Sequence, residues 1–221
     1  MTDNNTNDET TAAIFDLARN RSLDEQVSHP GREKRRLPKR FYKHAEVGAH
    51  EEGHAILLDG RVVKTPSKRP LAVPSLALAQ ALAAEWEAQK DEIDPRSMWL
   101  TKLANTAIDL VAPRREAVID ELASYAGADL LCYRAEHPAA LGKLDAFRLA
   151  ALHNAVTLTG SAVTGLAVVL GRLSPQEAFD IAHLDEHWQM ELCGEDEDEV
   201  ARLAIRRAEL VETGRFLALL D

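Results

Sequence analysis

The side chains best suited to chemistry lie near the C-terminal end of the chain, at His183, Glu186 and His187. They form the pattern His-x-x-Glu-His, which is the zinc-binding arrangement of inverted zincin peptidases. Two imidazoles separated by one helical turn can hold a zinc ion, and the glutamate can activate a zinc-bound water. The sequence therefore offers a zinc metallopeptidase as one candidate function.

The surrounding periodicity argues against zinc chemistry. A helix predicted from Pro175 to about Leu192 places its apolar residues on one side, at Ala178, Ile181, Leu184, Trp188 and Leu192. Both histidines then fall on the opposite side, in water, whereas the zinc-binding helix of a zincin is buried. Few residues follow the motif, so a distant third ligand has little room. We therefore expect no metal site.

The same predicted helix carries polar side chains in and beside its apolar stripe. Asp185 falls within the stripe, Gln189 lies next to it and Glu186 lies at its boundary. A carboxylate in an apolar environment is costly unless it is paired or faces a cleft. Two interpretations stay open: a salt bridge to Arg202 or Arg206 of the last helix, or an acidic notch that faces a partner protein.

Other residues that could do chemistry give weaker signals. The chain has no Gly-x-Ser-x-Gly motif, no phosphate-binding loop and no Gly-x-Gly-x-x-Gly after a strand. Cys132 and Cys193 lie far apart, and we predict that both are buried thiols. Asn105 and Asp109 lie one helical turn apart, so they either bond to each other or anchor a helix to a sheet. No nucleophile with a base is present, and we expect no cofactor.

Charge excludes two classes of partner. The formal net charge of −10 over 221 residues argues against nucleic-acid binding and against adhesion to anionic lipid. The N-terminal sequence MTDNNTNDETT is polar and acidic, with no apolar signal-peptide core. We therefore expect a cytoplasmic protein.

The segment from Leu149 to Gly171 is the longest without Asp, Glu, Lys or Arg. It is long enough to cross a bilayer, but its hydroxyl side chains, Asn154 and His153 dilute its hydrophobicity, and no aromatic belt frames it. We predict one buried helix at the centre of a helical domain, with no stable membrane insertion. Gly160 and Gly165 are expected to allow close helix packing.

The elements before that helix predict an α+β fold. Asp59-Gly60 separates two apolar runs and predicts a hairpin, after a strand over 41–47 and before a short edge strand over 71–73. From Ser75 onward the pattern is helical, with Trp86 in the core. We therefore expect a flexible polar tail (1–39), a small antiparallel β-rich N-terminal domain (40–74) and a larger all-helical domain (75–221).

Seven segments stand out along the chain: RFYK (40–43), LDGRVVKTP (58–66), EWEAQ (85–89), LTKLANTAID (100–109), DLLCYRA (129–135), LTGSAVTGLAV (158–168) and DEHWQMELCG (185–194). They resemble a known family, the chaperones that assemble the alpha subunit of the F-type ATP synthase in mitochondria and alphaproteobacteria. They follow the family's order and cover nearly all of the chain beyond the tail. The chain departs from the pattern at Cys193, where members usually carry tryptophan, and before Leu144, where a segment of a few dozen residues is missing.

The resemblance implies a molecular chaperone without enzyme activity, cofactor or metal. Such a protein binds the unassembled alpha subunit by the surface that the beta subunit later covers, and so promotes assembly of the F1 sector. Asp185 and Glu186 match the family's acidic motif and are expected to bind the partner together with Gln189. We expect Glu186 to be the more exposed carboxylate. An alphaproteobacterial, cytoplasmic protein that is monomeric when free is also expected.

Overall fold

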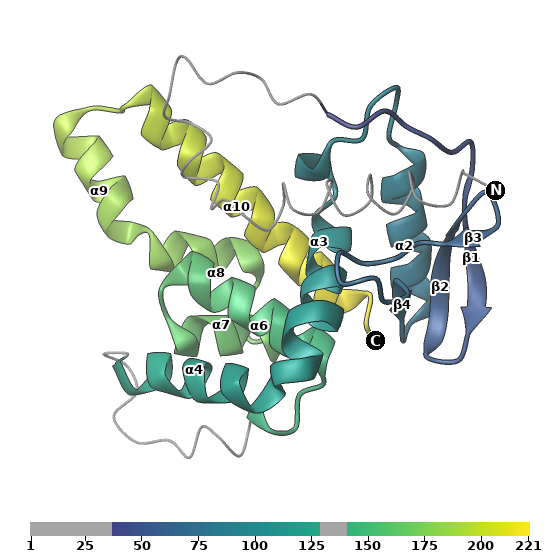
Figure 1. Ribbon diagram of the computed structural model, residues 1–221. Coiled ribbons are helices and arrows are strands. Elements are labelled where there is room, and N and C mark those ends of the chain that lie inside the picture. The colour runs from purple at the N-terminus through teal and green to yellow at the C-terminus, as the bar shows by residue number, and fades with distance from the viewer. Residues whose placement is uncertain (1–36, 129–140) are drawn as a thin grey trace.

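A small antiparallel sheet forms the N-terminal part of the computed structural model, which describes residues 37–128 and 141–221 (Figure 1). β1 (Ala45–His50) pairs with β2 (Gly53–Leu58), which also pairs with β3 (Arg61–Val62) and β4 (Ala72–Val73). Asp59 (φ +49°) and Gly60 (φ +79°) make the turn between β2 and β3. The predicted hairpin is confirmed, and the strand expected over 41–47 begins at Ala45 instead.

Helix α2 (Leu76–Glu87) packs against the sheet because one side of it is apolar. The Ser75 hydroxyl accepts a hydrogen bond from the Leu78 backbone N–H at 3.4 Å and caps the helix, as predicted. Leu78, Leu82 and Trp86 are fully buried in one cluster with Ile56 and other sheet residues. We call this the sheet cluster.

The remainder of the described chain is helical. Helix α3 continues directly into a π-helical turn, then into a short 3-10 turn that contains Pro113, and then into α4. Pro113 therefore lies at the start of a new helix, and no loop separates that helix from the one before it. The helices after the sheet and α2 are η2 (Pro95–Ser97), α3 (Trp99–Thr106), η3 (Ala107–Val111), η4 (Ala112–Arg114), α4 (Arg115–Ala128), α6 (Ala146–Thr159), α7 (Ala162–Val169), α8 (Pro175–Ala182), α9 (Leu184–Cys193) and α10 (Glu197–Ala218).

These elements confirm the α+β class, with a small sheet followed by helices. The division at residues 74 and 75 stays a prediction. The sheet cluster also contains residues of α2, α3 and α10, among them Leu100 and Phe216. The first 36 residues of the predicted tail lie outside the described residues, as does Cys132.

The apolar segment 149–171 is two helices, so the prediction of one continuous helix was wrong. Gly160 adopts φ +68° and ends α6, and the Ser161 hydroxyl caps α7 by accepting the Thr164 N–H at 3.1 Å. These local stop and start signals prevail over the unbroken apolar run. Gly165 packs closely, as predicted, since a Cβ there would lie 2.8 Å from Val156 Cγ2. Within the described residues, no helix has the length and apolar character to span a membrane.

Helix α6 is nevertheless the central helix of the fold. Ala151 belongs to the sheet cluster. Leu152 and Val156 join α4 and η3 residues in a second cluster, and Ala155 and Leu158 join residues of α7, α8 and α10 in a third. One helix therefore connects every apolar cluster found in the described part of the chain.

The hairpin turn makes the first testable prediction. The Asp59 carboxylate accepts the backbone N–H groups of His44 (2.9 Å) and Lys43 (3.1 Å), which lower the pKa of Asp59. Its contribution to stability is therefore present above the unfolded-state pKa, ~3.9, and is lost as the pH falls through the lower folded-state pKa. Asp59→Asn keeps a favourable Asn-Gly turn but removes the charge. The melting temperature of wild type should exceed that of the variant at neutral pH, and the gap should close in acid. A gap that does not change with pH would contradict this assignment.

Candidate functional site

The helix predicted from Pro175 to about Leu192 is interrupted at His183. Its first part, α8, starts with the predicted capping box between Ser174 and Glu177. His183 is only 3% exposed; its ring stacks on Phe179 at 3.9 Å between centroids, and its Nδ1 lies 3.0 Å from the Phe179 carbonyl oxygen. The chain leaves helical geometry there (φ −117°, ψ 30°), and α9 begins at Leu184 in a new phase.

This break turns the apolar side of α9 toward solvent. Leu184, Trp188 and Leu192 are 67%, 60% and 64% exposed, and no residue of α9 is buried. Ile181, at the end of α8, is also exposed. We call these four residues the α9 apolar row. The expectation that the row faces the core and that His183 faces water was wrong, because it assumed one continuous helix.

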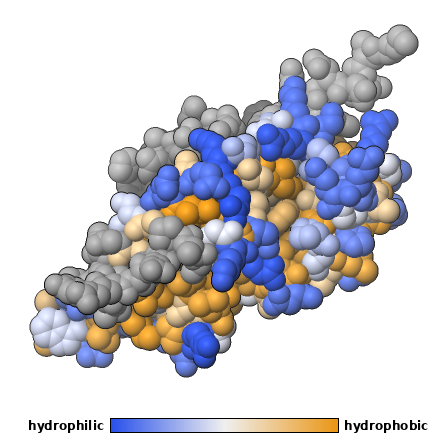
Figure 2. Space-filling model, turned by 90° about the horizontal axis from the view of Figure 1, so that it is seen from below, coloured by the Kyte–Doolittle hydropathy of each residue, from blue (hydrophilic) through white to orange (hydrophobic). Residues whose placement is uncertain are grey.

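Figure 1 shows α9 at the edge of the molecule, joined to α8 and α10 and not covered by another described helix. Its half-buried side consists of Glu186, His187 and Met190, of which Met190 packs against the third cluster. Seen from below, the helical side of the molecule presents apolar surface broken by hydrophilic residues (Figure 2). Helix α9 is therefore held at its inner side and its ends, and it presents its outer side to solvent.

The acidic residues at the start of α9 differ in exposure. Asp185 and Gln189 are exposed, whereas Glu186 is only partly exposed, so Asp185 is the more accessible carboxylate and the expected order is reversed. Among the described residues, no ion pair joins Asp185 or Glu186 to the last helix. Arg206 instead donates to the Leu158 carbonyl at 2.9 Å. The structural salt bridge that the sequence left open does not form with Arg206, and Arg202 pairs with Glu199.

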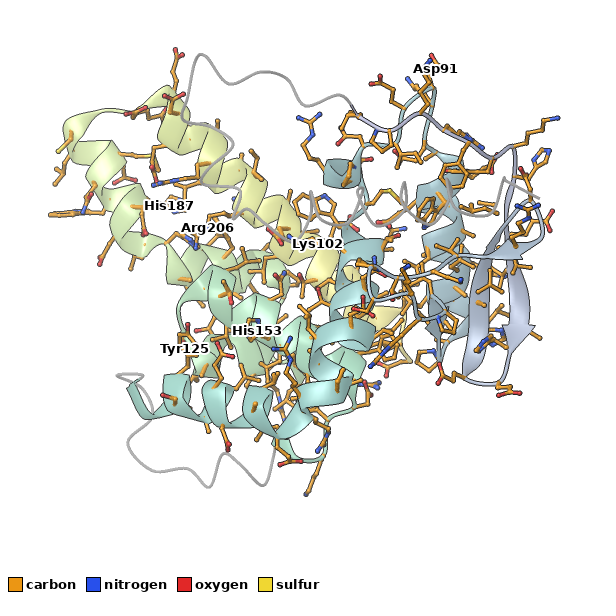
Figure 3. The ribbon with its side chains drawn as sticks, viewed as in Figure 1. Asp91, Lys102, Tyr125, His153, His187 and Arg206 are labelled. Carbon is orange, nitrogen blue, oxygen red and sulfur yellow. The ribbon has the colours of Figure 1, made fainter. Side chains whose placement is uncertain are left out.

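The zinc-peptidase hypothesis is not supported. His183 packs against Phe179, and His187 lies on the following helix (Figure 3). In residues 37–128 and 141–221, no three His, Cys, Asp or Glu side chains cluster in a way that could hold a metal ion. Cys193 is exposed at the end of α9, contrary to the prediction of a buried thiol.

Two of the family-like segments, RFYK and EWEAQ, join the sheet to α2. Arg40 donates to the carbonyl oxygens of Glu87 (3.0 Å) and Gln89 at the end of α2, and to that of Lys43 (2.6 Å). The Tyr42 hydroxyl donates to the Trp86 carbonyl at 2.5 Å, and burial raises the pKa of Tyr42 to about 12. These residues satisfy carbonyl groups that a helix end leaves without intrahelical partners.

EWEAQ also fixes the start of α3. The Glu85 carboxylate accepts the backbone N–H groups of Leu100 (2.8 Å) and Thr101 (2.9 Å) and the Thr101 hydroxyl. Burial raises the pKa of Glu85, and these hydrogen bonds oppose that rise. A carboxylate at this position is favourable because a helix N-terminus presents free N–H groups and positive partial charge.

Two further contacts link α3 and the turn after it to distant segments. Asp109 accepts the Thr65 hydroxyl (2.7 Å) and the Ser67 N–H (2.9 Å), so it anchors the π-helical turn to the loop after β3 and not to a strand of the sheet. Lys102 of α3 pairs with the buried Glu209 of α10 at 2.9 Å (Figure 3). No local pattern predicts this pair, because its partners lie on helices that are far apart in the chain.

A family model described as the ATP12 chaperone protein matches residues 39–156. This chain belongs to the ATP12 chaperone family. The crystal structure of Atp12 from Paracoccus denitrificans is 33% identical, with a TM-score of 0.76, and the match covers 83% of this chain and 99% of that one. The crystal structure of a putative chaperone from Agrobacterium tumefaciens is also 33% identical, with a TM-score of 0.79, and covers 96% of this chain and 98% of that one.

Membership of the ATP12 family confirms the expected class, a chaperone of ATP synthase assembly and not an enzyme. The family model ends within α6, so α9 lies outside the matched residues. The match to the Agrobacterium chaperone extends over nearly the whole chain. The EWEAQ segment lies within the matched residues and holds the scaffold together, whereas α9 presents side chains that the scaffold does not use.

The tryptophans test this division between scaffold and surface. Trp86 is fully buried, so Trp86→Ala should lower the free energy of unfolding by about 3–5 kcal/mol. Trp188 is 60% exposed, and Trp188→Ala should change it by no more than about 0.5 kcal/mol, the usual range for surface substitutions. Urea unfolding followed by circular dichroism measures both. A large loss for Trp188→Ala would show that α9 packs against the protein in solution.

Proposed function

We propose that this ATP12-family protein binds the unassembled alpha subunit of the F-type ATP synthase and promotes assembly of the F1 sector. Family membership supports the chaperone role, and the resemblance of the sequence segments supports the alpha subunit as the client. The observation that carries the proposal is the α9 apolar row, which a stable scaffold exposes to solvent. The protein acts in the cytoplasm and is monomeric when free.

An apolar row of this kind suits a holding chaperone. Single exposed apolar side chains are common on soluble proteins, but several at helical spacing mark an interaction surface. Leu184, Trp188 and Leu192 recur at intervals of four residues, so they form one strip along the length of α9, and the exposed Ile181 lies at the end of α8 that precedes it. A narrow strip gives modest affinity, which lets the client leave when its permanent neighbour arrives.

Asp185, Glu186 and Gln189 are the proposed polar contacts of this surface. Charged residues around an apolar centre orient a partner and raise the rate of association, and they exclude partners of the wrong charge. Asp185 and Gln189 lie on the exposed side, and Glu186 lies on the half-buried side of α9. The alpha-subunit surface that they cover is the one that later meets the beta subunit.

Charge reversal on α9 tests this function. Asp185→Lys and Glu186→Lys should each weaken alpha-subunit binding by about tenfold or more, or about 1.4 kcal/mol, because each places a cation where a carboxylate meets the client. The measurements are suppression of aggregation of purified alpha subunit and the dissociation constant. Circular dichroism and the melting temperature should stay at wild-type values.

Asp120→Lys is the matched control, because Asp120 is an exposed acidic residue on α4. It makes the same change in net charge away from α9 and should leave capture of the alpha subunit intact. Equal capture by all three variants and wild type would refute a role for the acidic residues of α9. Failure of the wild-type protein to bind alpha subunit would refute the proposed client.

A further inference from the structure

We infer that the client segment seated on α9 is both apolar and basic, with large apolar side chains along one side and Lys or Arg residues beside them. This inference rests on the proposed function and specifies the chemistry of the partner. It follows from three features of the described residues: the α9 apolar row, the carboxylates on both of its borders, and the charge of the chain that follows.

The apolar row determines the apolar part of the client. Leu184 and Leu192 are separated by eight residues of helix, which corresponds to ~12 Å at 1.5 Å per residue. Two turns of an amphipathic helix in the client match this length. Trp188 lies midway along the row and presents the largest exposed side chain, of the type that most often dominates binding energy at interfaces.

Carboxylates border the row on both sides. On a helix with 3.6 residues per turn, Asp185 and Gln189 lie along one edge of the row and Glu191 lies along the other. All three side chains are exposed, and among the described residues neither Asp185 nor Glu191 makes an ion pair. A client segment therefore meets negative charge on whichever side it extends beyond the apolar row.

The following chain adds to this negative charge. Residues 184–199 contain no Lys or Arg, and the segment Glu195–Glu199 is entirely acidic. Part of this charge serves the fold, since Asp196 caps α10 by accepting the Asp198 N–H at 2.9 Å and Glu199 pairs with Arg202. Within residues 37–128 and 141–221, the carboxylates of α9 make no capping hydrogen bond and no ion pair. An acidic client segment would bring like charges together, whereas a basic one would gain attraction and faster association.

A set of matched synthetic peptides tests the inference without the alpha subunit. One is a helical peptide with leucines at helical spacing flanked by arginines, the second has glutamates in place of the arginines, and the third keeps the arginines but replaces leucine with serine. Fluorescence anisotropy measures binding to the full chain. The first peptide should bind at least about tenfold more tightly than either of the others, and more weakly as salt is added.

Substitutions locate that binding on α9. Asp185→Lys combined with Glu191→Lys should remove the preference for the basic peptide, and Leu184→Ser combined with Trp188→Ser should abolish binding of all the peptides. Asp120→Lys should change neither the preference for the basic peptide nor its affinity. Cys193 lies exposed at the end of α9, so a photo-crosslinker attached to it in a Cys132→Ser background should label the bound peptide.

The outcomes separate the inference from the proposed function. Equal binding of basic and acidic peptides, no binding of the basic peptide, or binding that survives the Leu184 and Trp188 substitutions would each overturn the inference, even if the alpha subunit is captured. A basic-peptide preference on α9 together with failure to capture alpha subunit would sustain the inference and overturn the choice of client.

Discussion

The structure depends on the burial of α6. Its side chains enter all three apolar clusters found in the described residues, so the sheet, α4 and the α7–α8–α10 layer are positioned relative to one helix. Small residues make this possible, because Ala151 and Ala155 let neighbouring elements approach and Gly165 of α7 lies against Val156. A larger side chain at Gly165 would force α6 and α7 apart and disturb the layer that supports α9.

Polar contacts then fix the elements around α6. Glu85 caps α3 from α2, Asp109 ties the turn after α3 to the loop beyond the sheet, and Lys102 pairs with Glu209 of α10. A buried pair of this kind adds little net stability but is costly to break, so it favours one arrangement of α3 and α10. Helix α9 takes part in none of these contacts and buries no residue. The scaffold is therefore complete without the outer side of α9, which leaves that side available for a partner.

Short-range patterns in the sequence predicted the turn, the helix caps and the buried side of α2, because these features depend on residues that are close together in the chain. Asp59-Gly60 adopts the positive φ angles of a hairpin turn, Ser75 and Ser174 cap their helices, and the spacing of Leu78, Leu82 and Trp86 gives the buried side of α2. Periodicity failed where a helix is interrupted. Gly160 and His183 each break an apolar run that reads as one helix, and the second break changes which side of α9 faces water.

The residue types thus predicted which residues form the candidate surface, but the predicted orientation of the helix that carries them was wrong. Asp185, Glu186 and Gln189 stood out because carboxylates interrupt an apolar stripe, yet the stripe itself is exposed and Asp185 is more accessible than Glu186. Burial of His183 against Phe179 could not be predicted, since it depends on how α8 packs against α10. The Lys102–Glu209 pair was missed for the same reason, because tertiary packing alone brings these residues together.

The central claim is that the outer side of α9 is the client-binding surface of a scaffold organised by α6. Hydrogen–deuterium exchange on the complex with the alpha subunit tests this claim most directly. Amides of residues 184–193 should exchange at least about tenfold more slowly in the complex than in the free protein, because short exposed helices open readily until a partner covers them. Amides of α6 should exchange at the same slow rate in both. Unchanged exchange in α9 together with new protection in the sheet would contradict the account.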